Sequence, residues 1–159
     1  MEAKMKTTLR RAVCLIMALC LFSAMTTAFA RSSLTLDAYS AGCVAESGGK
    51  IAIWIDVTGT NPHMDKIGSD AIYLYESTDR ERYTRVAIYE PKDYPIMLTT
   101  NAISYYEDIV TYQGIPGRYY YALVYCYAEK DGVSDSKPYE TATVRAIHYL
   151  YMYIMKKQA

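Results

Sequence analysis

Hydrophobic and polar residues alternate with a period of two along most of the chain after residue 31, and this alternation is typical of β-strands. The longest such stretch is residues 117–130. One face of this predicted strand suits a core and carries Tyr120, Ala122, Val124, Cys126 and Ala128. The other face is a tyrosine stripe made of Tyr119, Tyr121, Leu123, Tyr125 and Tyr127. The strand is expected to end at the turn formed by Asp131 and Gly132.

Two other stretches predict strands with a clear inner face. In residues 50–57 the inner face is aliphatic, with Ile51, Ile53, Ile55 and Val57, while Trp54 lies opposite. Residues 71–76 place Ile72 and Leu74 inward and Tyr73 and Tyr75 outward. Weaker patterns predict strands over residues 33–45, 83–90, 103–112 and 139–146, the last with Ala142 and Val144 inward.

Turn-forming residues separate these predicted strands, with glycine or proline in residues 47–49, 58–69, 91–95 and 113–117 and polar loops at residues 77–82 and 131–136. No stretch between residues 31 and 145 has a convincing helical period. About seven short strands with regular turn signals predict an all-β fold, a two-sheet antiparallel β-sandwich.

The order of these elements resembles an immunoglobulin-like or fibronectin type III domain. The resemblance rests on Trp54 in the second strand, on Tyr120, Ala122 and Val124 after the turn at residues 115–117, and on the hairpin that leads to residues 141–144. Trp54 departs from the family pattern, because its alternation places it opposite the aliphatic face.

The first 30 residues have the pattern of a secretory signal peptide. A basic start is followed by an apolar run over residues 12–25 and by Ala28-Phe29-Ala30, a small-x-small cleavage site. A membrane anchor is the alternative, but a spanning helix needs about 20 apolar residues. The expected product is secreted, begins at Arg31, and consists of a sandwich domain over residues 31–146 and an apolar tail over residues 147–159. The tail is expected to continue the last strand or pack on the sandwich; a membrane-surface anchor is the alternative.

Removal of the signal peptide changes the amino-acid composition of the expected mature chain. It takes away four basic residues, one acidic residue and both phenylalanines, and leaves 13 Lys and Arg against 16 Asp and Glu, a net charge of −3. The chain therefore has no basic field to hold a nucleic acid. The remaining aromatic residues are 18 tyrosines and Trp54. Cys43 and Cys126 are the cysteines left, and outside the cytoplasm they are expected to bridge the two sheets, with two buried free thiols as the alternative.

Several short segments also resemble a narrower group, a family of small, uncharacterised proteins secreted by gut Firmicutes. They are MTTAFA (25–30), RSSL (31–34), GGKI (48–51), MDKIG (64–68), VTYQG (110–114) and YAEKDG (127–132). The resemblance covers most of residues 20–145 and implies secretion and a β fold. It implies no activity for any residue.

The sequence contains no pattern that indicates catalysis, a metal or a cofactor. His63 and His148 are the histidines, and neither belongs to a nucleophile motif, so a hydrolase with His63 as its base is the weaker hypothesis. Asp131 and Asp135 flank a glycine, but a calcium cage needs about six oxygen ligands and a hairpin turn explains them better. We therefore expect a protein that is not an enzyme, with no metal site and no cofactor.

The tyrosine stripe is the main functional hint in the sequence. If the third, penultimate and last strands share a sheet, six side chains project from one outer face: Tyr73, Tyr75, Tyr119, Tyr121, Tyr125 and Tyr127. Tyrosine offers a large rigid contact and a hydrogen bond, so this face is the candidate binding surface for a protein or glycan. The structural alternative is cross-strand pairing that stabilises the sheet by about 0.2–1 kcal/mol per pair. Self-association through a sheet edge or the apolar tail is the other functional alternative.

Overall fold

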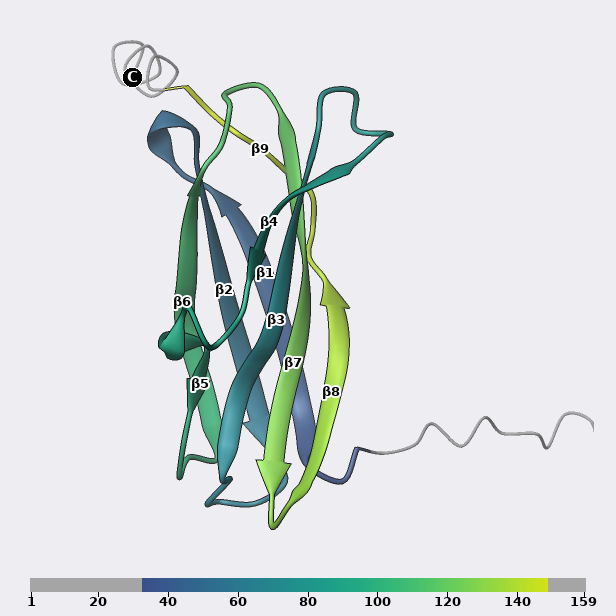
Figure 1. Ribbon diagram of the computed structural model, residues 1–159. Helices are drawn as coiled ribbons and strands as arrows, with labels where there is room; N and C mark the ends of the chain where they lie inside the picture. The colour runs from purple at the N-terminus through teal and green to yellow at the C-terminus, as the bar shows by residue number, and fades with distance from the viewer. Residues whose placement is uncertain (1–32, 149–159) are drawn as a thin grey trace, which may run out of the picture. The chain divides into compact units, whose positions relative to one another are not determined.

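The computed structural model of the chain describes residues 33–148. The predicted signal peptide and tail residues 149–159 lie outside the described residues. Two antiparallel sheets pack face to face (Figure 1), which confirms the predicted all-β sandwich. Residues 33–148 form nine strands: β1 (Leu36–Ala45), β2 (Lys50–Gly59), β3 (Lys66–Ser77), β4 (Thr84–Tyr89), β5 (Leu98–Thr99), β6 (Ser104–Gln113), β7 (Tyr119–Lys130), β8 (Val133–Glu140) and β9 (Val144–Arg145). Two short 3-10 turns accompany them, η1 (Ser47–Gly49) and η2 (Pro95–Met97).

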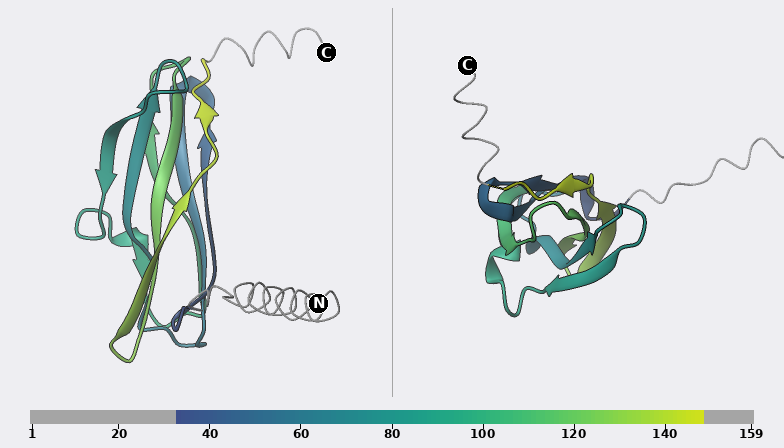
Figure 2. Two further views of the ribbon diagram at one scale, coloured as in Figure 1. Left: turned by 90° about the vertical axis from the view of Figure 1, so that its right-hand side faces the viewer. Right: turned by 90° about the horizontal axis from the view of Figure 1, so that it is seen from above.

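The two sheets have different strand orders. One has three strands in the order β1-β2-β6, and the other has the order β4-β3-β7-β8, with β5 on β3 and β9 on β7. Figure 2 shows the two layers from the side and from above. β3 and β7 are the longest described strands, and they pair along nearly all of their length, from Lys66 opposite Glu129 to Ser77 opposite Tyr119.

The core is formed by the aliphatic faces that the alternation predicts. Ile51, Ile53, Ile55 and Val57 of β2 are completely buried against Ile72 and Leu74 of β3 and the inner residues of β7. Trp54 points to the opposite face of β2, as predicted, and its ring lies over Gly42 of β1. A Cβ atom at residue 42 would fall 2.1 Å from the indole, so glycine makes room for the ring.

Tyr120 ties the start of β7 to the turn before it. Its side chain is fully buried, and its hydroxyl accepts the Ile115 N–H at 2.8 Å and donates to the carboxylate of Glu76. Arg118 donates to the same carboxylate. Burial and the bond to Glu76 raise the pKa of Tyr120 to about 12, so the phenol keeps its proton. These bonds fix the entry of the chain into the central strand.

The last hairpin differs from the sequence prediction in three ways. The predicted strand over residues 139–146 is divided, because β8 ends at Glu140 and β9 covers only Val144 and Arg145. The expected loop over residues 131–136 is wrong: the turn is only Asp131 and Gly132, both with positive φ, and β8 begins at Val133. A polar segment forms this strand because β8 is an edge strand with one side open to solvent. Ala142 is exposed rather than inward, because Thr141 takes the inner position and its hydroxyl accepts the Ala122 N–H at 2.9 Å.

The start of the C-terminal tail packs on the sandwich. Ala146 donates its N–H to the Arg118 carbonyl at 2.9 Å, and the Ile147 carbonyl accepts the Gly49 N–H at 2.8 Å. The chain thus passes from β9 to the turn between β1 and β2. Of the predicted tail, the structure describes residues 147 and 148. Within the described part of the chain, no helix has the length and hydropathy needed to cross a bilayer.

Candidate functional site

The six predicted tyrosines lie on the outer face of β3 and β7, as the sequence indicates. Tyr75 stands directly opposite Tyr121, and Tyr73 stands opposite Leu123. Farther along β7, Tyr125 faces Ala71 and Tyr127 faces Gly68. All six side chains are half-buried. We call this surface the tyrosine face: Tyr73, Tyr75, Tyr119, Tyr121, Tyr125 and Tyr127.

Ring contacts hold the tyrosine face together. Tyr75 and Tyr121 stack with their centroids 4.9 Å apart and their planes 7° from parallel. Tyr83, in the loop before β4, meets Tyr121 edge-on at 4.8 Å. Tyr73 and Tyr125 form a second edge-on pair at 5.7 Å. Aromatic pairs of this kind contribute about 0.5–1.5 kcal/mol beyond their buried area, so these contacts help to hold the paired rings in place.

Arginines cover one part of the tyrosine face. The Arg85 guanidinium lies 5.4 Å from the Tyr73 ring centroid. Arg80 and Arg145 lie 5.9 Å and 5.7 Å from the Tyr119 ring. Exposed cation–π contacts of this kind are worth about 0.5–1 kcal/mol. The face therefore presents cations together with rings at the end of β7 where Tyr119 lies.

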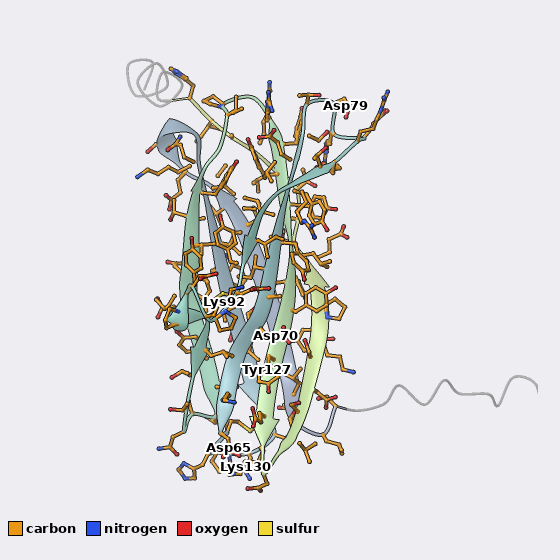
Figure 3. The ribbon with its side chains drawn as sticks, in the orientation of Figure 1. Asp65, Asp70, Asp79, Lys92, Tyr127 and Lys130 are labelled. Carbon is orange, nitrogen blue, oxygen red and sulfur yellow. The ribbon has the colours of Figure 1, made fainter. Side chains whose placement is uncertain are left out.

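An acidic residue that the sequence analysis did not predict lies near the Tyr127 end of this face. Asp70 is the extra residue where the pairing of β3 with β7 shifts between Ser69 and Ala71. Burial raises the pKa of its carboxyl, and the Ser136 side chain on β8 opposes this rise, so the Asp70 side chain extends across β7 toward β8. Ser136 stands opposite Tyr127 and shares its outer face. Figure 3 shows Asp70 and Tyr127 close together on the same part of the sheet.

The other end of β7 carries a polar network. Tyr127 donates its hydroxyl to Glu129 at 2.8 Å, and Lys66 pairs with the same carboxylate at 2.9 Å. Burial raises the pKa of Tyr127, so its phenol remains a hydrogen-bond donor at neutral pH. Lys130 and Asp65 form a second ion pair at 3.1 Å beside the β7–β8 turn, and Figure 3 labels both residues.

The two cysteines do not form the predicted bridge. Cys43 and Cys126 are buried free thiols on facing sheets. Cys43 hydrogen-bonds the Thr141 side chain, and Thr141 bonds Ala122, so Cys43 lies level with Ala122. Cys126 is four residues farther along β7, a span of about 13 Å in a strand. A disulfide needs Cα atoms within about 7 Å, so the expected Cys43–Cys126 disulfide does not fit this register.

We expect both thiols to resist alkylation in the folded protein. Burial raises the pKa of Cys43 and of Cys126 to about 12, so neither forms a reactive thiolate at pH 8. Iodoacetamide at pH 8 should label neither cysteine without denaturant and both in denaturant without reductant, as counted by mass spectrometry. Failure to label the unfolded, unreduced chain would instead establish a disulfide.

The residues considered for other chemistry lie apart from the tyrosine face. His63 is exposed, and its Nδ1 lies 3.0 Å from the Asn101 side-chain oxygen. Among residues 33–148, no group of three or more His, Cys, Asp or Glu side chains is placed to hold a metal ion. A depression of about 520 Å³ lies near the end of β9 and is lined by Pro116, Gly117, Arg145, Ala146, Ile147 and His148. It includes none of the six tyrosines.

Comparison with known proteins adds no relative to this description. A scan against protein-family models, a search of the curated proteins and a search of the solved structures each found no match to the chain. The site must therefore be interpreted from its own geometry.

Proposed function

We propose that the chain is a secreted, non-catalytic sandwich module that binds a protein or glycan partner through the tyrosine face. The proposal includes an immunoglobulin-like or fibronectin type III-like architecture. Two observations support that architecture: the strand orders β1-β2-β6 and β4-β3-β7-β8, and Tyr120, whose hydroxyl bonds the backbone of the preceding turn. A tyrosine in this position is a feature of such sandwiches.

The observation that carries the binding proposal is the set of tyrosine rings gathered on one open sheet face. The Tyr121 ring contacts both Tyr83 and Tyr75. Tyr73 and Tyr125 form a second pair of rings on the same face. Among residues 33–148 no third layer of strands or helices covers β3 and β7 (Figure 1). Rigid rings lose little entropy on binding, and their hydroxyls and the nearby arginines supply polar contacts. Such a surface fits a recognition role.

The two edges of the β4-β3-β7-β8 sheet are poorly suited to self-association. β4 is a short edge strand with a register shift in its pairing to β3. β8, the opposite edge, carries Lys137 and Pro138, and Pro138 has no N–H to pair with another strand. Short, irregular, charged or proline-containing edges are how sandwiches avoid edge pairing.

The experiment that tests the binding proposal compares two triple variants of residues 31–159, a segment that contains the whole described core. Tyr73, Tyr121 and Tyr125 are replaced by serine in one variant. The control replaces Tyr39, Tyr94 and Tyr106, three exposed tyrosines outside the face, by serine. Each protein is screened against glycan arrays and host and bacterial surface extracts.

We expect a ligand that binds the starting protein and the control and binds the face variant at least about tenfold more weakly, which corresponds to 1.4 kcal/mol of binding free energy. Circular dichroism should show that both variants are folded. Equal binding by a folded face variant would contradict the proposed binding surface.

A further inference from the structure

We propose that Asp70 binds a cationic side chain, lysine or arginine, of a protein partner that docks on the tyrosine face. This inference rests on the proposed function and narrows its partner to a protein segment with a basic residue. Asp70 is suited to the role by its position: its side chain crosses β7 between the positions of Tyr125 and Tyr127. A partner on the tyrosine face would meet this carboxyl among the rings.

The carboxyl of Asp70 has an unused acceptor. Its Oδ1 atom is buried and is the one buried side-chain oxygen or nitrogen in residues 33–148 that lacks a hydrogen-bond partner. Unpaired buried polar atoms are rare in proteins because each costs free energy. None of the ion pairs formed within residues 33–148 includes Asp70, so its charge also lacks a cation. Asp70 as a residue is partly exposed, so a cation from outside can approach its carboxyl, and a rotation of the carboxyl would bring Oδ1 to that cation.

The surroundings favour a cationic donor over a neutral one. Within residues 33–148, arginines lie over Tyr73 and Tyr119 but no cation lies over the Tyr125 ring. A ring face and a carboxylate both attract a positive charge, and together they form the kind of site that accepts an ammonium or guanidinium group. Desolvation raises the pKa of Asp70, and a bound cation would reverse this effect by stabilising the carboxylate. A sugar hydroxyl would bring a donor but no charge.

The test is a nuclear magnetic resonance titration of ¹⁵N-labelled residues 31–159 with small probes. The cationic probes are N-acetyl-lysine methylamide and N-acetyl-arginine methylamide. N-acetyl-norleucine methylamide has an aliphatic side chain without the charge, and methyl glucoside represents the glycan alternative. The variants are Asp70→Asn, which keeps the shape, and Glu140→Gln, which removes an exposed carboxylate opposite Leu123 on the same sheet face.

We expect both cationic probes to shift the amide signals of Asp70, Ala71, Ser136 and residues 125–127, and norleucine to leave them unchanged. Asp70→Asn should weaken this binding about tenfold, and Glu140→Gln should leave it unchanged. In the bound state the pKa of Asp70, followed by its carboxyl ¹³C signal, should fall. Asp70→Asn should melt no lower than the starting protein, because it removes an unpaired buried charge.

Other results would overturn the inference. Cationic probes that shift no signal near Asp70, or that bind Asp70→Asn as well as the starting protein, would show that Asp70 is not the cation site. If methyl glucoside alone shifts the signals near Asp70, then Asp70 is not the cation site and the partner is a glycan. If the tyrosine variant loses its partner while Asp70→Asn keeps it, this inference fails and the proposed function stands. If the tyrosine variant keeps its partner, the proposed function fails first.

Discussion

Replacing Tyr120 by phenylalanine is expected to lower the free energy of unfolding by about 1.5–3 kcal/mol, as expected for loss of a buried hydrogen bond to a charged group. The hydroxyl is the acceptor for the Ile115 N–H and a donor to Glu76, and phenylalanine has neither function. Replacement by alanine should cost about 3–5 kcal/mol, because it also empties the space of a fully buried ring. Urea unfolding followed by circular dichroism measures both changes.

The control for Tyr120 is Tyr106, which is 64% exposed on the other sheet. Tyr106→Phe should change the unfolding free energy by no more than about 0.5 kcal/mol. An effect of Tyr120→Phe as small as that of the control would contradict the role given to the Tyr120 hydroxyl in joining β7 to its preceding turn.

Replacing Gly68 by alanine should destabilise the protein by about 2–5 kcal/mol, through backbone strain and a steric clash together. Gly68 has a φ of +147°, and a Cβ atom there would lie 2.1 Å from the carbonyl oxygen of Met97. Because Gly68 pairs with Leu98 on one side and Tyr127 on the other, the clash should separate β5 from β3. Hydrogen exchange at Leu98 and Thr99 should accelerate along with the loss of stability.

Gly132 provides the matched control for this second prediction. It also has a positive φ, +76°, but a Cβ atom there would meet nothing within 4 Å. Gly132→Ala should therefore cost only the conformational strain, about 1 kcal/mol. Equal costs at the two glycines would show that the contact with Met97 contributes nothing.

Much of the fold follows from alternation alone, because a sheet with one buried face repeats every two residues. The inward sides of β2, β3 and β7 and the outward position of Trp54 were all predictable in this way. The hairpin between β7 and β8 was not, because polar residues on an edge strand resemble a loop in sequence. Ala142 was misassigned for a related reason: a buried threonine whose hydroxyl bonds the backbone can replace an apolar residue at an inner position.

The candidate site was predictable only in part. The six tyrosines were identified from their spacing, since residues two apart share a face. Tyr83 and Arg85 join the face through ring contacts formed by β4 and its loop, and pairing with β4 had to be known first. Asp70 carried no signal in the sequence, because a register shift in β3 places it on the face. The predicted cysteine bridge was wrong for a similar reason. How far two facing strands are offset along their length depends on how the sheets pack, and the sequence pattern does not show it.

Stability and recognition draw on the same rings in this face. Each ring that contacts its neighbour helps to hold β3 and β7 together, so loss of binding must be separated from loss of folding. Tyr75 and Tyr121 are the most strongly coupled pair, and we expect their double replacement to cost less than the sum of the single costs because each single change already breaks the stack.

A map of chemical-shift changes on ¹⁵N-labelled protein, recorded when the first identified partner binds, would locate the binding surface. We expect the shifted amides to lie on β3, β7 and β8, centred on Tyr73, Tyr121 and Tyr125. Shifts confined to the β1-β2-β6 sheet, or to the end of the sandwich near Arg145, would contradict this expectation.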